Sequence, residues 1–362
     1  MGMFMRKRPL WIYVALLVAW TNLGICSWCI AGKPSLAGSA VLLQMIRDNA
    51  VQQELRISDQ QKKKILSALR MVDAPWFRSR HLKTLTREQE ISKLVGQLEA
   101  KLQAILTEAQ QQRLLQLRCQ ALGTRMLLRS DVIERLELSK QQVETLTSAF
   151  HATDSANSQL PNEEASNERR EQLKQQELSV VKQELTDVQE RRLSTLTGAP
   201  FDFATVRRTY PLAPELSLED AQWIQGETIS LADLQGKVVA LHFYAFQCIN
   251  CQRNLPHYKA WMKDYEDRDF VVIGIQTPET AAERNRDQVL AAAKREGIKY
   301  PLLLDLESSN WKSWSNTMWP TVYLIDRQGF LRRWWQGELN WQGGNGEQQM
   351  RKTIEQLLAE PK

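Results

Sequence analysis

The sequence contains few of the residues that build disulfide frameworks or metal sites. Among 362 residues there are 5 cysteines and 4 histidines. So few cysteines exclude a fold held together by several disulfides. A structural zinc site needs four ligands, and after Cys251 no further Cys-x-x-Cys or histidine pair follows at the usual spacing. We therefore expect no metal ion and no cofactor.

The chain also lacks a block of lysine and arginine residues interleaved with aromatic residues, apart from its extreme N-terminus. Its formal net charge of +5 is small for its length. These two features give no indication of a nucleic-acid partner. The length and the hydrophobic fraction of 43% allow more than one buried domain, and we expect two.

The first residues carry the pattern of an export signal. Arg6, Lys7 and Arg8 precede an apolar run over residues 10–20, and small residues follow at 37–40. This pattern predicts either a cleaved signal peptide or an uncleaved membrane anchor within residues 1–40. Under either interpretation the rest of the chain lies outside the cytoplasm, in the periplasm or cell envelope, and the second interpretation adds a membrane tether.

Residues 41–198 contain almost no glycine or proline and predict an all-α domain. Four hydroxyl residues in it, each followed three positions later by a glutamine, have the pattern of helix capping boxes: Ser58, Thr107, Ser139 and Thr186. The first and third of these segments match each other, as do the second and fourth, at an offset of roughly 80 residues. We therefore expect a duplicated helical module.

The Leu-Thr-x-x-Gln motifs at 106–110 and 185–189 resemble those of periplasmic helical proteins of the CpxP and Spy type. That resemblance implies a role as a stress-linked chaperone or sensor, although the motifs also arise simply because they cap helices. Between the two copies, residues 151–169 are polar, and we expect a mobile loop there. Cys119 is expected to be a small buried side chain.

Residues 199–214 contain several prolines and predict a linker. After it, apolar runs alternate with helical patterns, which indicates an α/β domain over residues 215–362. The expected strands are 238–244, 270–275, 301–304, 321–325 and 330–334, and the expected helices are 252–265, 281–296 and 348–358.

Two cysteines follow the first of these strands, at the point where a helix is expected to begin. The unpaired N–H groups and the dipole of a helix N-terminus stabilise a thiolate, so we expect a lowered pKa for Cys248. Cys248 is then the attacking sulfur, and Cys251, one turn further on, resolves the mixed disulfide. The alternative that the sequence leaves open is an inert structural disulfide.

Several motifs in this domain resemble the thioredoxin-like domains of TlpA/ResA-type extracytoplasmic thiol–disulfide oxidoreductases. They are Gly236-Lys237-Val238-Val239, the pair Cys248 and Cys251, Pro256, and Trp319-Pro320-Thr321. Cys248-Ile249-Asn250-Cys251 and Thr277-Pro278-Glu279 are further similar to the thioredoxin-like domain of DipZ-type proteins. The resemblance implies a mixed sheet flanked by helices, a cis Trp319–Pro320 peptide opposite the dithiol, and a helix that Pro256 kinks.

Three residues depart from the thioredoxin pattern. His242 stands where cytoplasmic thioredoxins have an aspartate, and it is interpreted either as an aid to proton transfer from Cys251 or as a packed polar residue. Gln247 replaces the usual tryptophan before the first cysteine. Ile249 and Asn250 replace Gly-Pro, and such a change alters the redox potential in a direction that sequence does not give.

The residues and the resemblance together predict an extracytoplasmic thiol–disulfide oxidoreductase. Its expected partners are protein thiols and disulfides of the cell envelope, with a membrane protein as a candidate for the partner that recharges the dithiol. The rival hypothesis is a helical chaperone or binding protein whose thioredoxin-like domain only docks partners. A peroxidase is less favoured, because the Phe246-Gln247 approach to Cys248 lacks the threonine and proline that peroxiredoxins use.

Overall fold

The computed structural model describes residues 40–161, 166–219 and 221–361. The chain divides into two compact units. The helical unit comprises the residues up to Ala68 together with Leu82–Arg207, and the sheet unit comprises Leu69–His81 together with the residues from Arg208 onward. The export signal or anchor expected in residues 1–40 lies outside the described residues, except for its last position. Among the residues described, no helix is long and apolar enough to cross a membrane.

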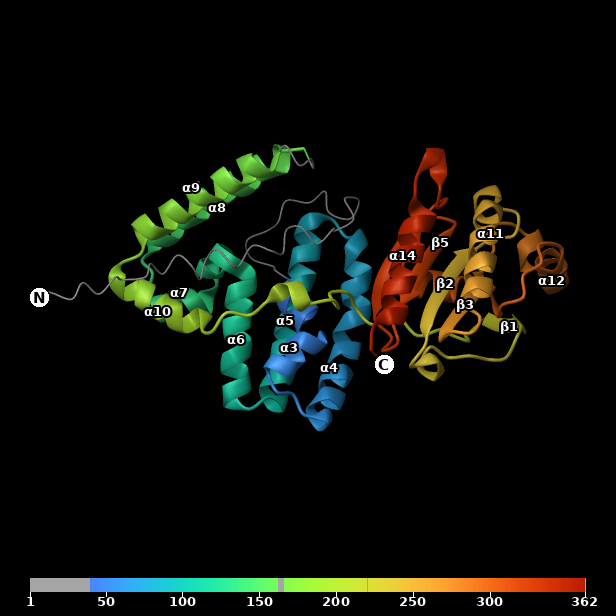
Figure 1. Ribbon diagram of the computed structural model, residues 1–362, viewed down its shortest axis with the longest axis horizontal. Coiled ribbons are helices and arrows are strands. Elements are labelled where there is room, and N and C mark those ends of the chain that lie inside the picture. The colour runs from blue at the N-terminus through green and yellow to red at the C-terminus, as the bar shows by residue number, and fades with distance from the viewer. Residues whose placement is uncertain (1–39, 162–165, 220, 362) are drawn as a thin grey trace, which may run out of the picture. The chain divides into compact units, whose positions relative to one another are not determined.

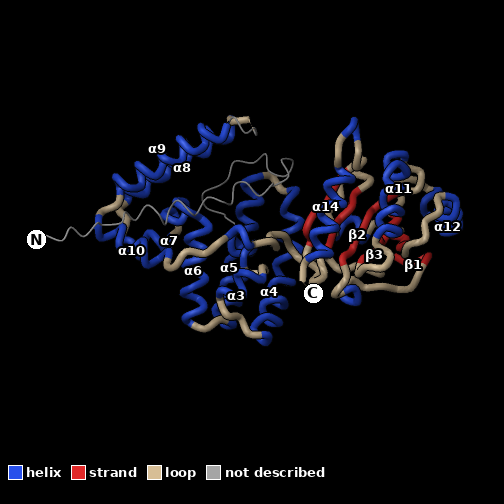
Figure 2. The backbone as a smooth tube through the Cα atoms, viewed as in Figure 1, coloured by secondary structure: helices blue, strands red, loops and turns tan. Residues whose placement is uncertain are grey.

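The helical unit is built from helices that follow one another with short connections (Figures 1 and 2). In chain order they are α2 (Val41–Met45), α3 (Asn49–Glu54), α4 (Asp59–Arg78, shared with the sheet unit), α5 (Thr84–Ile105), α6 (Glu108–Leu122), α7 (Ser130–Leu136), α8 (Lys140–Gln159), α9 (Asn167–Glu184) and α10 (Asp187–Thr197). The all-α character expected for this part of the chain is confirmed.

All four expected capping boxes are present. Thr107, Ser139 and Thr186 each accept a hydrogen bond from the backbone N–H three residues on, while the glutamine there bonds back to the cap. Ser58 and Gln61 exchange the same pair of hydrogen bonds. Each box fixes a helix start, because two N–H groups that the helix leaves unpaired find side-chain oxygens.

The capping glutamines also hydrogen-bond to each other in pairs, and the two pairs are equivalent. Gln61 Nε2 donates to Gln110 Oε1 at 2.7 Å, and Gln142 Nε2 donates to Gln189 Oε1 at 2.9 Å. The first nitrogen also bonds to the carbonyl of Ile105, and the second to the carbonyl of the equivalent residue in the other copy. The same hydrogen-bond arrangement therefore occurs at both pairs of capping glutamines.

The prediction of a mobile loop over residues 151–169 is wrong in extent. Helix α8 continues to Gln159 and α9 already begins at Asn167, so the polar stretch is mostly helical. Tertiary contacts override the low helix propensity of its serine and asparagine residues. Phe150 is fully buried, and Asp154 pairs with Arg125 at 2.5 Å.

The sheet unit contains one mixed six-stranded sheet in the order β1-β4-β3-β2-β5-β6. Its strands are β1 (Ala221–Gln225), β2 (Val238–Tyr244), β3 (Phe270–Gln276), β4 (Leu302–Asp305), β5 (Thr321–Ile325) and β6 (Leu331–Gln336). Strands β2, β3 and β4 run parallel, whereas β5, β6 and β1 are antiparallel to their neighbours. The expected α/β class is confirmed, and all five expected strands are found. β1 is additional.

Helices cover both faces of this sheet. One face packs against α11 (Ile249–Asp264), α12 (Arg286–Arg295) and α14 (Gly346–Ala359), of which α11 and α14 stand in front of the strands in Figure 1. The other face packs against α13 (Ser309–Ser313), the loops before β2, and the end of α4. The α4 contribution comes from far upstream of the expected domain start.

Candidate active site

Strand β2 carries the chain to the candidate dithiol through the middle of the sheet. Every residue of β2 is buried, and the strand lies between β3 and β5. After Tyr244 the chain turns, with the N–H of Cys248 donating to the carbonyl of Ala245 at 3.1 Å. Cys248 is then the N-cap residue of α11. An apolar strand in the sheet centre and a helix starting at its carboxyl end thus hold the cysteine at a rigid position.

The Cys248 sulfur receives hydrogen bonds from the first turn of α11. The backbone N–H of Cys251 donates to Cys248 Sγ at 3.4 Å. The Cys251 thiol and the backbone N–H groups of Cys251 and Asn250 together lower the pKa of Cys248 to about 7, against the opposing effects of partial burial and of the Glu279 carboxylate. Cys248 is partly exposed and is a free thiol. It is therefore substantially a thiolate at neutral pH.

Cys251 has the opposite environment. It is 1% exposed, and burial together with its hydrogen bond to Cys248 raises its pKa well above the usual range. It stays protonated and donates its proton toward the Cys248 sulfur. The two sulfurs of one motif are thus an accessible thiolate and a sequestered thiol, which is the division of labour that disulfide exchange requires.

The cis-proline turn lies at the same edge of the sheet. The Trp319–Pro320 peptide is cis, as the resemblance implies. Thr321, the next residue, begins β5 and pairs with Phe243 near the end of β2. Cys248 and Trp319 both pack against the same hydrophobic cluster. The expected neighbours Trp319, Pro320 and Thr321 are therefore gathered where β2 delivers the dithiol.

His242 lies under the site in a cage of aromatic rings. Its ring stacks on Tyr258 at 4.3 Å between centroids, and its Nε2 lies 3.0 Å from the hydroxyl of Tyr300. Burial lowers its pKa to about 3, so it is neutral near pH 7. Within the described chain its other nitrogen, Nδ1, has no hydrogen-bond partner. Neither ring nitrogen forms a hydrogen bond with a cysteine of the described chain, and this favours the packing interpretation of His242.

The remaining expected site residues occupy α11. Ile249, Asn250 and Cys251 form its first turn, with the Ile249 side chain 56% exposed beside the reactive sulfur. Pro256 lies inside the helix, which continues through it to Asp264.

A buried carboxylate that the sequence did not indicate holds the loop before the dithiol. Glu283 is 0% exposed and accepts hydrogen bonds from the backbone N–H groups of Gln247 at 2.7 Å, Glu279 at 2.7 Å and Thr280 at 2.9 Å. It thereby joins the residue preceding Cys248 to the loop after β3. An acidic residue in a polar stretch carries no pattern that distinguishes it from a surface residue.

Asn254 makes a second connection that sequence reasoning missed. Its side-chain nitrogen donates to the carbonyl of Gly337 at 3.1 Å, and its oxygen accepts from the N–H of Leu339 at 3.0 Å. The N–H of Gly337 in turn donates to the carbonyl of Pro320 at 2.7 Å. One buried amide on the cysteine helix is thereby linked to the cis-proline turn.

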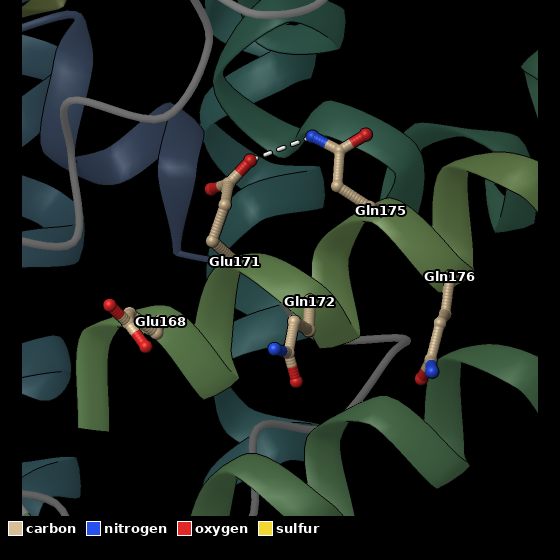
Figure 3. Close-up of a pocket in the computed structure, with 5 residues that line it drawn as sticks. All are labelled: Glu168, Glu171, Gln172, Gln175 and Gln176. Carbon is tan, nitrogen blue, oxygen red and sulfur yellow. Dashed lines mark hydrogen bonds between the residues drawn. The ribbon is translucent and has the colours of Figure 1, made fainter. Parts of the chain in front are cut away.

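A surface hollow on the helical unit carries no comparable chemistry. It has a volume of about 480 Å³ and lies on α9. Figure 3 shows its five lining residues on that helix, with Glu171 accepting a hydrogen bond from Gln175: Glu168, Glu171, Gln172, Gln175 and Gln176. Within the described ranges, no cluster of three or more histidine, cysteine or acidic side chains could hold a metal ion.

Comparisons with known proteins point to the sheet unit. A family model described as the AhpC/TSA family matches residues 211–334. The protein DipZ of Mycobacterium tuberculosis is 44% identical over 104 residues, which is 29% of this chain and 15% of DipZ. The thioredoxin-like protein YneN of Bacillus subtilis is 32% identical over 120 residues, covering 33% of this chain and 66% of YneN.

The thiol-disulfide oxidoreductase ResA of Halalkalibacterium halodurans is 29% identical over 114 residues, or 31% of this chain and 59% of ResA. Each match thus spans about a third of this chain and only part of the relative. The matched length agrees with one domain that contains the sheet, the dithiol and the cis-proline turn. Residues 211–334 therefore belong to a thioredoxin-like domain of the TlpA/ResA type.

Proposed function

We propose that this protein exchanges disulfides with protein thiols through Cys248 and Cys251. The observation that carries the proposal is the contrast between the two sulfurs: Cys248 is accessible with a pKa of about 7, and Cys251 is buried with a raised pKa. The name of ResA, a thiol-disulfide oxidoreductase, agrees with this chemistry. An inert structural disulfide would not require one accessible sulfur with a lowered pKa and one buried sulfur with a raised pKa.

The exchange proceeds in two steps that move two electrons. The Cys248 thiolate attacks one sulfur of a substrate disulfide, so that a mixed disulfide forms and the other substrate sulfur leaves as a thiolate. That thiolate takes the Cys251 proton. The Cys251 sulfur then attacks Cys248 Sγ, the internal disulfide forms, and the second substrate sulfur leaves. The substrate is reduced and the dithiol oxidised, and the same steps run in reverse for an oxidant.

The surface around the Cys248 sulfur is suited to binding a protein substrate. Ile249 is 56% exposed on one side of Cys248, and Met318, just before the cis-proline turn, is 46% exposed. Exposed apolar side chains beside a reactive group favour a polypeptide partner. An extended segment of such a partner would pair with the backbone beside Pro320.

The direct test follows the reduction of insulin disulfides by the full chain, with dithiothreitol as the electron source. Cys248→Ser is expected to abolish turnover, because no thiolate remains to attack. Cys251→Ser is expected to accumulate mixed disulfides through Cys248. Cys119→Ser serves as the matched control, because burial raises the pKa of that thiol to about 11 and keeps it unreactive. Full activity in Cys248→Ser would refute the proposal.

A second candidate function is binding of client proteins by the helical unit. The repeated capping-glutamine pairs Gln61–Gln110 and Gln142–Gln189 support it, because they match the resemblance to helical periplasmic chaperones. The double variant Cys248→Ser/Cys251→Ser separates the two functions. If it still suppresses aggregation of an unfolded client as well as the unaltered protein does, chaperone activity is independent of the dithiol.

The cellular location and the direction of exchange complete the proposal. An extracytoplasmic location is supported by the basic and apolar pattern of residues 6–20. Alkaline phosphatase fused after Lys362 is expected to be active only if that end of the chain is exported. The midpoint potential of the dithiol assigns the direction: a strongly reducing value requires a membrane partner that supplies electrons.

A further inference from the structure

A short segment from the first quarter of the chain forms part of the sheet unit. Leu69–His81 groups with the residues after Arg208. Phe77 from this segment is 4% exposed and lies in the hydrophobic cluster on one face of the sheet. Its ring meets Tyr323 of β5 edge-on at 6.0 Å and Trp334 of β6 at 6.2 Å. The segment is therefore built into the domain and does not merely rest on it.

Arg80, three residues after Phe77, donates to the backbone at the end of α13. Its Nη2 lies 2.6 Å from the carbonyl oxygen of Trp314 and 2.9 Å from that of Ser315. The guanidinium stacks over the Phe77 ring at 3.5 Å, which fixes its plane. Carbonyls at a helix C-terminus have no partner within the helix, so the two Nη2 hydrogen bonds fix where the following loop begins.

The loop that starts there leads to the cis-proline turn. Ser315 adopts a left-handed conformation with φ 49°, and the cis Trp319–Pro320 peptide follows four residues later. Trp319 stacks on Trp311 of α13 at 3.9 Å between ring centroids. A contact that fixes the end of α13 therefore also fixes the position of Trp319 at the cis-proline turn.

The other end of the loop is tied to the same arginine. Tyr323 lies on β5, just beyond the turn, and its hydroxyl is 3.4 Å from Arg80 Nη2. The same hydroxyl donates to Asn316 Oδ1, within the loop, at 2.7 Å. Arg80 thus contacts the element before the loop and the strand after it.

We propose that Arg80 is a positioning residue that holds the loop of residues 315–320 in the conformation that receives the extended backbone of a protein substrate beside Cys248. This inference rests on the proposed disulfide exchange and adds a residue that the dithiol motif does not contain. The guanidinium acts on the docking of a polypeptide and not on the sulfur chemistry. A small disulfide needs only the two cysteines and no docked backbone, so its reaction does not depend on the loop.

The test compares two disulfides in the full chain. Insulin is the protein substrate, and 5,5′-dithiobis(2-nitrobenzoate) is the small one. In Arg80→Gln we expect the KM for insulin to rise about five- to tenfold with kcat within twofold, because the loss affects docking. The rate with the small disulfide and the pH profile of Cys248 alkylation are expected to stay unchanged. Arg80→Lys, which keeps one charged donor, is expected to give an intermediate KM.

Arg78→Gln is the matched control, because Arg78 is exposed on the same segment. The inference is overturned if Arg80→Gln behaves like Arg78→Gln toward insulin, or if both disulfides lose reactivity by the same factor. Should Arg80→Gln fail to fold, the same comparison in Arg80→Lys decides. An unaltered protein that does not reduce insulin refutes the proposed function itself, whereas an active one with a silent Arg80 refutes only this role.

Discussion

The Glu283 carboxylate and the backbone N–H of Gln247 are joined by a 2.7 Å hydrogen bond, although 36 residues separate them in the sequence. Gln247 directly precedes Cys248, so this bond fixes the approach of the chain to the reactive sulfur. The same carboxylate holds the N–H groups of Glu279 and Thr280. One buried acidic side chain therefore sets the spacing between the cysteine loop and the loop that carries Glu279.

Replacing Glu283 by glutamine tests this arrangement. The amide has one acceptor oxygen in place of two and turns an NH₂ group toward backbone N–H donors. Loss of charge-assisted hydrogen bonds in a buried site is expected to lower the free energy of unfolding by about 1.5–3 kcal/mol. Urea unfolding followed by tryptophan fluorescence measures this change in unfolding free energy, because every tryptophan after residue 40 belongs to the sheet unit. Glu307→Gln, at an exposed ion pair, is the control, and an equal loss there would contradict the assignment.

The pH dependence of Cys248 reactivity follows from its lowered pKa. The thiolate is the reacting form, so the rate of alkylation by iodoacetamide is expected to rise with pH through a midpoint near 7 and to level off above it. Burial raises the pKa of Cys251, which is expected to contribute no second reactive thiol below pH 9. A midpoint near the ordinary cysteine value would contradict the hydrogen-bonding arrangement at the start of α11.

Glu279 offers a way to move that midpoint. Its carboxylate raises the pKa of Cys248, because two negative charges repel. Glu279→Gln is therefore expected to lower the midpoint and to speed alkylation at pH 6 roughly two- to threefold. Glu266→Gln, an exposed glutamate just beyond the other end of α11, is the control and is expected to leave the profile unchanged. A midpoint that rises in Glu279→Gln would exclude this electrostatic role.

Sequence patterns predicted correctly those helices and strands that are determined by residues close together in the chain. The buried run of β2, the helix that begins after Cys248 and the capping box at Ser139 each depend on residues a few positions apart. β1 was missed because only Ile224 is buried in its five residues, so its apolar pattern is weak. Edge strands of this kind form because a neighbouring strand offers hydrogen bonds, and that neighbour is not visible in the local sequence.

The supporting residues of the site escaped prediction for a different reason. Arg80 bonds to Trp314 across 234 positions, and Asn254 bonds to Gly337 across 83. A single sequence contains no signal for such pairs, because an arginine or asparagine on a helix usually faces solvent. The cis Trp319–Pro320 turn could be expected only from the family resemblance. Sequence motifs thus identify the residues that carry out the chemistry. The residues that position them can be identified only from contacts in the folded chain.

The duplication predicted from the sequence repeat implies equal effects on stability at equivalent residues of the helical unit. Gln142 caps α8 and donates to Gln189 and to the carbonyl of Glu184. Gln142→Ala is expected to lower the free energy of unfolding of the helical unit by about 1–2 kcal/mol, measured by far-UV circular dichroism. Gln61→Ala, at the matching position, is expected to cost a similar amount. Gln141→Ala, an exposed neighbour, is the control. A large difference between Gln61 and Gln142 would contradict the equivalence of the two copies.

Phe77 tests whether the upstream segment belongs to the core of the sheet unit. Its ring fills space between Tyr323 and Trp334 at 4% exposure, so Phe77→Ala leaves a cavity among aromatic side chains. Such a change is expected to cost about 3–5 kcal/mol of unfolding free energy. Tryptophan fluorescence is the measurement, because it reports the sheet unit among the described residues. Met71→Ala on the same helix is the control, since Met71 is 62% exposed and its loss creates no cavity. If the fluorescence transition of Phe77→Ala coincides with that of Met71→Ala, the sheet unit folds without the segment, and the role inferred for Arg80 loses its structural basis.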